Sequence, residues 1–224
     1  MVTDIALLRL LQLISPSLPI GMYCYSQGIE MAVEEGLCTN ETQTSEWIEG
    51  VMARCLACVD LPVFIRLYSA WEKDDNEQII HWSRILTASR ETAELRAEDR
   101  QTGQALARLL YSLEIEKSEI WMRSTEATLV NMFALASVAW GVPVREAAIG
   151  YLWSWLENQV LCAVKLVPLG QVSGQRLLVQ LAESIPELVA RSFVINDEDI
   201  GGSTFGFALM SSRHERQYSR LFRS

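Results

Sequence analysis

The sequence predicts an all-α protein, a single-domain bundle of roughly eight to ten helices that spans residues 1–224. Three observations favour this fold class. Apolar residues recur every three or four positions in most segments, alternation with a period of two is nearly absent, and half of the residues are apolar, with a mean hydropathy of +0.12. The 3.6-residue period is typical of helices that bury one face, and the apolar content is enough for a sizeable core.

The first half of the chain predicts four helices. Residues 4–14 carry apolar side chains around most of a helical circumference, and the segment SPSLPIG then ends this helix with two prolines and a glycine. Residues 26–36 predict a short helix that ends at a glycine. Residues 44–58 and 61–71 predict a helix pair separated near Pro62, because proline is favoured in the first turn of a helix.

Two charged helices follow in the middle of the chain. An aspartate and a glutamine three residues apart resemble a capping box at the start of residues 75–86. Residues 90–113 form a long charged amphipath that we expect to lie on the surface. The spacing of Asp99 from Arg96 and Arg100 predicts exposed ion pairs there, each stabilising the helix by only about 0.3–0.5 kcal/mol.

The remaining helices are more apolar. Residues 125–140 and 143–167 each predict a helix, and the second is apolar on nearly every face, so we expect it at the centre of the domain. The uncharged run 127–144 contains asparagine, glycine and proline and falls short of a membrane span, so a buried helix explains it better. Residues 175–191 predict a last helix that Pro186 interrupts.

Charge and cysteine content limit the function classes. The net charge of −9 and the pI near 4.8 argue against nucleic-acid binding, which depends on neutralising phosphates. The N-terminal segment has no basic region before its apolar stretch, so it does not indicate a signal peptide, and we expect a cytoplasmic protein. Five scattered cysteines fit a reducing compartment better than a disulfide framework.

Three motifs invite a metal or catalytic interpretation. Cys55 and Cys58 have the spacing of a redox or zinc motif, but no second ligand pair follows, and two core residues on one helix face are favoured. His81 and His214 are the only histidines, and neither has a nucleophile nearby in sequence. The acids from Asp197 onward lack the glutamate that a calcium loop requires; this stretch is also a candidate to meet the tail of the same or another chain. Neither GxxxxGK[ST] nor GxGxxG occurs, so no known phosphate loop is encoded.

A polar seam interrupts the apolar helix 143–167. Asn158 and Lys165 are seven residues apart, which leaves them only about 20° out of line on one face. Lys165 has two interpretations that the sequence leaves open. It extends to solvent from the helix end, or it has a role in partner contact or conformational change.

The C-terminal tail, residues 211–224, has a net charge opposite in sign to that of the rest of the protein. It carries four arginines and one glutamate, a net charge of +3, which leaves −12 for the remainder. Such a tail can clamp its own domain, bind an acidic partner or keep a terminus soluble. Because Tyr218, Leu221 and Phe222 lie among the arginines, we favour a docking segment that is mobile until a partner orders it, after a flexible acidic and glycine-rich loop at about 195–210.

Three blocks of the sequence are similar to the urease accessory protein UreF family. The first is SPSLPIGMYCYSQGIE, although a cysteine stands at position 24, where the family usually has serine. The second is WLENQVLCAVKLVPLGQVSGQRLL, and the third is RHERQYSRLFRS at the end of the chain. Residues in 90–103 fit the family more loosely.

The resemblance implies an all-α homodimer that binds UreD (called UreH in some organisms) and recruits the GTPase UreG, which carries nickel, to apo-urease. It implies a non-enzymatic adaptor, with no catalytic residue, no resident metal and no cofactor. The partner-binding residues that it implies are Pro19, Gly21, Tyr23, Ser26, Gly28, Glu30, Arg90, Glu91, Arg96, Lys165, Arg213, His214, Gln217, Tyr218, Ser219, Arg220 and Phe222.

Two other functions compete with an adaptor. The arginines permit a GTPase regulator that inserts an arginine finger into a partner's nucleotide site, which can accelerate hydrolysis by about 10³ to 10⁵. An all-α hydrolase or metalloenzyme is the other alternative, and it requires a stoichiometric metal in the pure protein.

Overall fold

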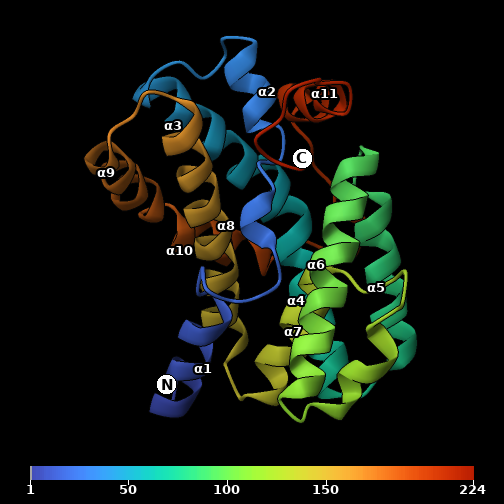
Figure 1. The fold of residues 1–224 in the computed structure, drawn as a ribbon. Helices are drawn as coiled ribbons and strands as arrows, with labels where there is room; N and C mark the ends of the chain where they lie inside the picture. Colours follow the sequence, from blue (N-terminus) through green and yellow to red (C-terminus); the bar gives the residue numbers. More distant parts are fainter. Residues whose placement is uncertain (1) are drawn as a thin grey trace.

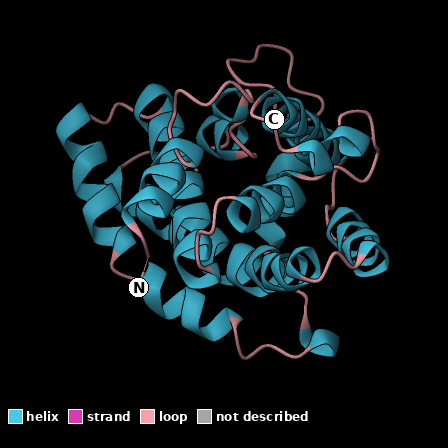
Figure 2. Cartoon of the chain, turned by 90° about the horizontal axis from the view of Figure 1, so that it is seen from below, coloured by secondary structure: helices cyan, strands magenta, loops and turns pink. Residues whose placement is uncertain are grey.

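Helices provide all the regular secondary structure of residues 2–224, which are the residues that this computed structural model describes (Figures 1 and 2). The predicted all-α fold is confirmed. Because α3 and α4 join end to end through a π-helical segment, η2, the eleven labelled α-helices form ten separate helices within this part of the chain, inside the expected range. The α-helices are α1 Asp4–Leu13, α2 Ile29–Glu34, α3 Glu41–Val51, α4 Leu61–Glu72, α5 Asn76–Ala88, α6 Ala93–Ser112, α7 Leu129–Ala139, α8 Val144–Leu166, α9 Gln171–Ala182, α10 Ile185–Ser192 and α11 Phe205–His214.

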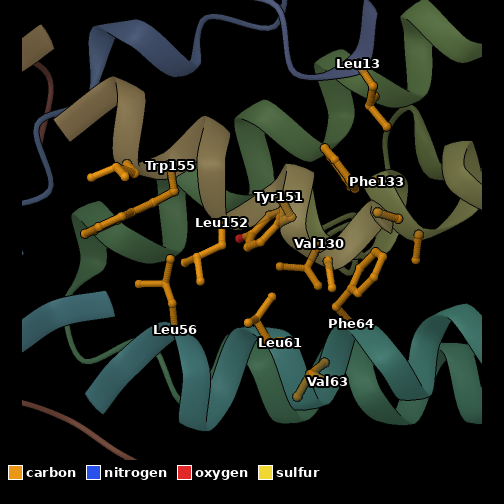
Figure 3. Packing of buried hydrophobic residues seen from close by; sticks show 14 of the residues in the cluster. Leu13, Leu56, Leu61, Val63, Phe64, Val130, Phe133, Tyr151, Leu152 and Trp155 are labelled. Atoms are coloured by element: carbon orange, nitrogen blue, oxygen red, sulfur yellow. The ribbon is translucent and has the colours of Figure 1, made fainter. Parts of the chain in front are cut away.

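Helix α8 is the centre of the molecule, as its sequence predicts. It packs against α9, α2, α10, α4 and α7, and most of its length is buried. Figure 3 shows Tyr151 of α8 on the side of Phe64 and Phe133, from α4 and α7, while Leu152 of α8 points toward Leu56 and Leu61. The ring of Tyr151 stacks on Phe64 with centroids 6.3 Å apart and meets the edge of Phe133 at 5.4 Å. Each such buried side chain contributes roughly 1.5–3 kcal/mol to folding.

Helix α4 begins at Leu61 with Pro62 in its first turn, as predicted, but the predicted break before it is absent. The chain is helical from α3 through the π-helical segment Met52–Asp60 into α4. Pro62 has no N–H to donate to the preceding turn, yet the carbonyls there have other donors. The Ala57 carbonyl accepts from Ser192 Oγ at 2.8 Å, and the Cys58 carbonyl accepts from the Gly201 N–H at 3.2 Å. Tertiary contacts therefore make the proline compatible with a continuous helix.

Helix α6 is not a purely surface helix, contrary to the expectation for residues 90–113. It starts at Ala93, with Thr92 as the N-cap, and one face is buried. That face includes Asp99, which forms a buried ion pair with Arg90 rather than an exposed pair along the helix. The sequence pattern did not indicate this buried face, because two of its residues, Glu98 and Asp99, are acids.

The C-terminal part of the chain is more helical than its composition predicts. Residues 205–210, expected within a loop, form the first part of α11. In the acidic stretch before it, Asp197 accepts from Arg66 Nε of α4 at 2.9 Å. Within residues 2–224, no hydrogen bond or ion pair joins this stretch to the tail of the same chain. Helix α11 packs on α2, so the last residues lie beside the N-terminal block (Figure 1). The predicted interruption at Pro186 is confirmed, since α10 begins there.

The apolar run 127–144 is a buried helix, α7, followed by a turn. Over residues 2–224, no helix combines the length and the hydropathy needed to cross a membrane.

Candidate partner-binding surface

The N-terminal block, residues 15–30, is a seat for the C-terminal tail. Two of its glycines have left-handed backbones, Gly21 with φ 77° and Gly28 with φ 81°. At Gly28 there is also no room for a side chain, because a Cβ would lie 3.0 Å from the backbone nitrogen of Ser211 in α11. The glycine therefore permits both the turn into α2 and the close approach of α11.

Glu30 holds the tail by its backbone. This residue in α2 is only 7% exposed. Its Oε1 accepts a hydrogen bond from the Leu221 N–H at 2.6 Å, and its Oε2 accepts one from the Phe222 N–H at 2.9 Å. Oε2 also lies 3.4 Å from Nε2 of His214. A buried carboxylate needs such donors, so the tail and Glu30 stabilise each other.

The last residues of the tail pair with the chain just before α2. The Ser26 N–H donates to the Ser224 carbonyl at 2.6 Å, and the Ser26 hydroxyl donates to the same oxygen. The Arg223 N–H donates to the Cys24 carbonyl at 2.8 Å. Ser224 Oγ donates to Oε2 of Glu98 in α6 at 2.9 Å. The tail therefore lies between the N-terminal block and α6.

Two nitrogen-bearing side chains of the C-terminal segment, an imidazole and a guanidinium, contact Glu94 in the first turn of α6. His214 is fully buried, and its Nδ1 lies 2.7 Å from Oε2 of Glu94. Arg220 donates to Oε1 of Glu94 at 2.6 Å and also to the Gln217 and Glu215 carbonyls. These contacts fold the tail back on itself and fix it to α6.

Phe222 fills the remaining space beside the end of α8. Its side chain is 6% exposed. The ammonium of Lys165 lies 5.5 Å from the centre of the Phe222 ring, while Lys165 itself is exposed. Lys165 extends to solvent at the helix end, in contact with the tail, and its role in partner contact stays a prediction. Asn158, the other member of the seam, donates from Nδ2 to the Tyr25 carbonyl at 3.0 Å.

The outer side of the tail faces solvent. Tyr218 is fully exposed and Leu221 is 63% exposed. Arg216 is also exposed, and its guanidinium makes no hydrogen bond or ion pair within residues 2–224. Arg213, by contrast, pairs with Glu35 of the turn after α2 at 2.9 Å. The tail thus presents an aromatic, an aliphatic and a cationic side chain on one exposed segment.

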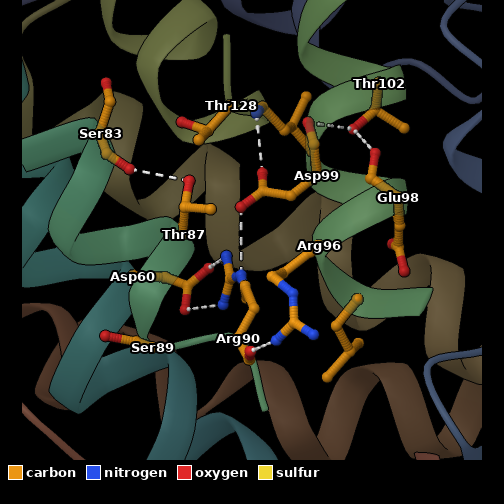
Figure 4. Close-up of polar contacts among 12 residues, drawn as sticks. Asp60, Ser83, Thr87, Ser89, Arg90, Arg96, Glu98, Asp99, Thr102 and Thr128 are labelled. Atoms are coloured by element: carbon orange, nitrogen blue, oxygen red, sulfur yellow. Dashed lines mark hydrogen bonds and ion pairs between the residues drawn. The ribbon is translucent and has the colours of Figure 1, made fainter. Parts of the chain in front are cut away.

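The predicted residues Arg90, Glu91 and Arg96 lie in the connection from α5 to α6 and in the first turn of α6. Arg90 donates to both oxygens of Asp60 at 2.7 and 2.9 Å and to Asp99 at 3.1 Å (Figure 4). Tyr151 Oη also donates to Asp60, at 3.1 Å. The guanidinium is therefore committed to acids inside the chain, and these two acids raise the pKa of Arg90 by more than burial lowers it.

Nearby, Glu91 and Arg96 are exposed. Glu91 accepts a hydrogen bond from the Ser203 hydroxyl, and Arg96 donates to the Arg90 carbonyl at 2.6 Å. Pro19 is exposed as well, and the Tyr23 hydroxyl donates to Oε2 of Glu157 at 3.3 Å.

The structure therefore divides the predicted residues into three groups. One group forms the seat or is buried in it: Gly21, Ser26, Gly28, Glu30, His214, Phe222 and the partly buried Gln217. A second group faces solvent around the seat: Pro19, Tyr23 in part, Lys165, Arg213, Tyr218, Ser219 and Arg220. The third group, Arg90, Glu91 and Arg96, lies between the end of α5 and the first turn of α6.

Sequence reasoning missed the acids that complete the seat. Glu98 is 5% exposed and accepts from Gln27 Nε2 at 2.7 Å as well as from Ser224. Burial raises the pKa of Glu98 to about 7, although these two hydrogen bonds oppose the shift. Asp60, which pairs with Arg90, was also missed. Its sequence context could have indicated a buried acid, because it is the one acid in the otherwise apolar run CLACVDLPVF.

The cysteine motif is not part of this surface. Cys55 is buried and Cys58 is partly buried, and both are free. Burial raises the pKa of the Cys55 thiol to about 11, so this thiol is protonated at neutral pH and unreactive.

Together, the fold and the surface define an all-α domain whose C-terminal tail is clasped by its own N-terminal block. The UreF family model matches residues 38–182. Three relatives, each named urease accessory protein UreF, match nearly the full length. They come from Alkalilimnicola ehrlichii (50% identical, 96% of this chain and 95% of the relative), Pseudomonas putida (46%, 99% of each) and Hahella chejuensis (44%, 98% and 99%). The chain belongs to the UreF family of urease accessory proteins.

Proposed function

We propose that this chain is a non-enzymatic adaptor in urease maturation. With UreD (UreH), it recruits the GTPase UreG to apo-urease for nickel insertion and maturation of the active site. Membership in the family of urease accessory proteins supports this proposal. The contacts of the tail seat also support it. They are mainly hydrogen bonds and ion pairs that hold a peptide segment, which is what an adaptor needs in order to present a binding segment.

The observation that carries the proposal is the division of the tail into two sides. Glu30 and Glu98 fix the inner side, so that Tyr218 and Leu221 remain exposed on the outer side. A solvated tail gains nothing from an exposed tyrosine and leucine. Aromatic residues next to arginines are the composition of binding hot spots, so the outer side of the tail is the proposed docking site for a protein partner.

The test is a double variant of the outer side, Tyr218→Ala with Leu221→Ala. Neither side chain packs into the body, so the variant should retain the wild-type melting temperature. It should no longer retain UreD and UreG when it is used as bait, and urease activation should fall. The control, Ile120→Ala with Val194→Ala, removes apolar side chains of similar exposure elsewhere, 71% and 78%. If the tail variant assembles and activates like this control, the docking proposal is wrong.

An arginine finger is the alternative function, and one observation favours it. Arg216 is a tail arginine that is exposed and whose side chain has no hydrogen-bond or ion-pair partner within residues 2–224, as a finger requires. A finger accelerates GTP hydrolysis by about 10³ to 10⁵, and Arg216→Ala abolishes the acceleration. An adaptor gives no acceleration of that size. Single-turnover GTP hydrolysis by UreG, with and without this protein, distinguishes the two.

We also propose that the protein is a cytoplasmic homodimer. The five cysteines are all free, which supports a reducing compartment. The exposed apolar residues of α1 support self-association, because Ile5, Leu8 and Leu11 are each more than half exposed. Light scattering should give twice the chain mass of 25.3 kDa at micromolar concentration, and a monomer mass would contradict the dimer.

A further inference from the structure

A second surface lies between the end of α5 and the start of α6, apart from the tail seat. It is an open groove of about 590 Å³, and the loop before α7 closes one end of it. Its polar rim comes from both helices and from this loop. The side chains that form it are Arg84, Thr87, Arg96, Arg100 and Thr125.

The groove concentrates cationic groups that the fold does not use. Arg96 and Arg100 are four residues apart on α6, so their side chains are neighbours on one face. Arg96 makes a single hydrogen bond, to the Arg90 carbonyl, which leaves most of its donors available. Arg100 is exposed and makes no hydrogen bond or ion pair to any residue in the described part of the chain.

The acids of the groove do not neutralise these two arginines. Asp99 lies at the base, but its Oδ2 accepts from Arg90 and its Oδ1 accepts from the Leu129 N–H at 2.9 Å. Glu126 accepts from Arg84 at 2.6 Å on the opposite wall. On a protein with a net charge of −9, the groove is therefore a local cationic site.

Three of the residues that line the groove are alanines. Ala88, Ala93 and Ala97 line it between the arginines. Small residues allow the backbone of another segment to approach closely, while the longer arginines on the rim reach its side chains. The volume is also far larger than an inorganic anion needs.

We infer that this groove binds an acidic segment of a partner protein. Carboxylates of the segment pair with Arg96 and Arg100, and the segment lies along the three alanines. Arginine suits this role because its planar guanidinium binds carboxylates bidentately. A nucleic acid is the less suitable polyanion, because the rest of the protein repels it.

Arg100→Gln is the sharpest test, because this side chain supports nothing else in the fold. The probe is a dye-labelled eight-residue peptide of alternating glutamate and alanine, with the glutamine analogue as the uncharged comparison. Fluorescence anisotropy on the full chain at low ionic strength should show binding of the glutamate peptide only. Arg100→Gln should weaken it at least about tenfold, the loss of one charge-assisted contact. Arg96→Gln with Arg100→Gln should abolish it.

The control is Arg145→Gln with Arg191→Gln, which removes two exposed arginines elsewhere and changes the net charge equally. It should bind the peptide within about twofold of wild type, as expected for small effects of distant charges. If both double variants lost peptide affinity equally, the effect would be due to net charge alone and the inference would be overturned. So would full competition by millimolar inorganic phosphate, which would mark a small-anion site. A change of oligomeric state in Arg100→Gln would identify a second copy as the occupant, contrary to the inference.

Discussion

At the scale of single residues, Glu30 connects segments that lie far apart in the sequence. It accepts a hydrogen bond from the N–H of Leu221, 191 residues later, and one from that of Phe222. Because the acceptors are carboxylate oxygens and the donors belong to the backbone, the contact does not depend on which side chains the tail carries. The tail side chains are therefore free to make other contacts, and that of Leu221 faces solvent.

Glu30→Gln should release the tail. The amide can accept only at its oxygen, and its NH₂ group then faces a backbone N–H, so one donor is left unsatisfied at a cost of about 1–3 kcal/mol. We expect a lower free energy of unfolding and faster tryptic cleavage after Arg216 and Arg220. Glu34→Gln is the matched control, since Glu34 is exposed on the same helix and makes no side-chain contact within the described residues. Equal cleavage rates in the two variants would contradict the role of Glu30.

Glu98 makes the stability of the fold depend on pH. Its pKa is about 7 in the folded protein and near 4.5 when exposed, so the folded state binds more protons between these values. The free energy of unfolding should therefore fall as pH rises from about 4.5 through 7, with a contribution of up to about 3 kcal/mol. In Glu98→Gln this dependence should be lost. Urea denaturation at pH 5, 6, 7 and 8 gives the free energy of unfolding of wild type and variant. If the two depend on pH in the same way, Glu98 is not the cause.

At the scale of elements, turns and helix ends position the seat more than helix propensity does. The left-handed turn at Gly28 lets α2 start directly under α11, and Thr92 caps α6 while its hydroxyl meets Ser211 of α11 at 2.8 Å. The π-helical segment before α4 ends at Asp60, which is thereby placed opposite Arg90. Each of these features is local in the backbone, yet each serves a contact with a distant segment.

Gly28→Ala and Gly21→Ala should differ in their effect on stability. Both glycines have positive φ, so each alanine costs about 1 kcal/mol in backbone strain. At Gly28 the new methyl group would also lie 3.0 Å from the Ser211 nitrogen, whereas at Gly21 no atom lies within 4 Å. We therefore expect Gly28→Ala to lose a further 1–3 kcal/mol or so, because α11 must move. Chemical denaturation of both variants gives the comparison, and equal losses would show that α11 adapts freely.

At the scale of the whole molecule, the two ends of the chain complete one structure around α8. From the tail, Phe222 joins the hydrophobic core around α8. The polar contacts of the tail are made with α2 and the first turn of α6 (Figure 1). The tail therefore covers Glu30, Glu94 and Glu98, and it provides hydrogen-bond donors to each of them. Its removal should expose those acids without dismantling the core.

Deleting residues 213–224 should leave a helical, cooperatively folded protein with a lower melting temperature. The loss follows from the burial of Phe222 and from the contacts of Ser224 and His214. The truncated protein should not assemble with UreD and UreG, as the Tyr218 and Leu221 double variant should not, but only the truncation should lower stability. Calorimetry and co-purification of both proteins separate these effects. Assembly of the truncated protein at wild-type levels would contradict a docking role for the tail.

The sequence by itself determined the all-α class, the central place of α8 and the composition of the tail. These follow from local information: the 3.6-residue period, the apolar character of residues 143–167 on all sides, and the arginines and aromatics near the end. The resemblance of three sequence blocks also singled out Ser26, Gly28 and Glu30 of the seat, as partner-binding residues. It missed Glu98 and did not indicate what any of them contact.

Only the tertiary structure decided that Glu30 accepts from the tail, that Arg90 is held by Asp60 and Asp99, and that α6 buries Glu98. It also decided that Pro62 does not break a helix, because donors from residues 192 and 201 reach the carbonyls of the preceding turn. The physical reason is the same in each case. A buried polar group is tolerated only where a partner satisfies it, and these partners come from segments that no local pattern relates to it.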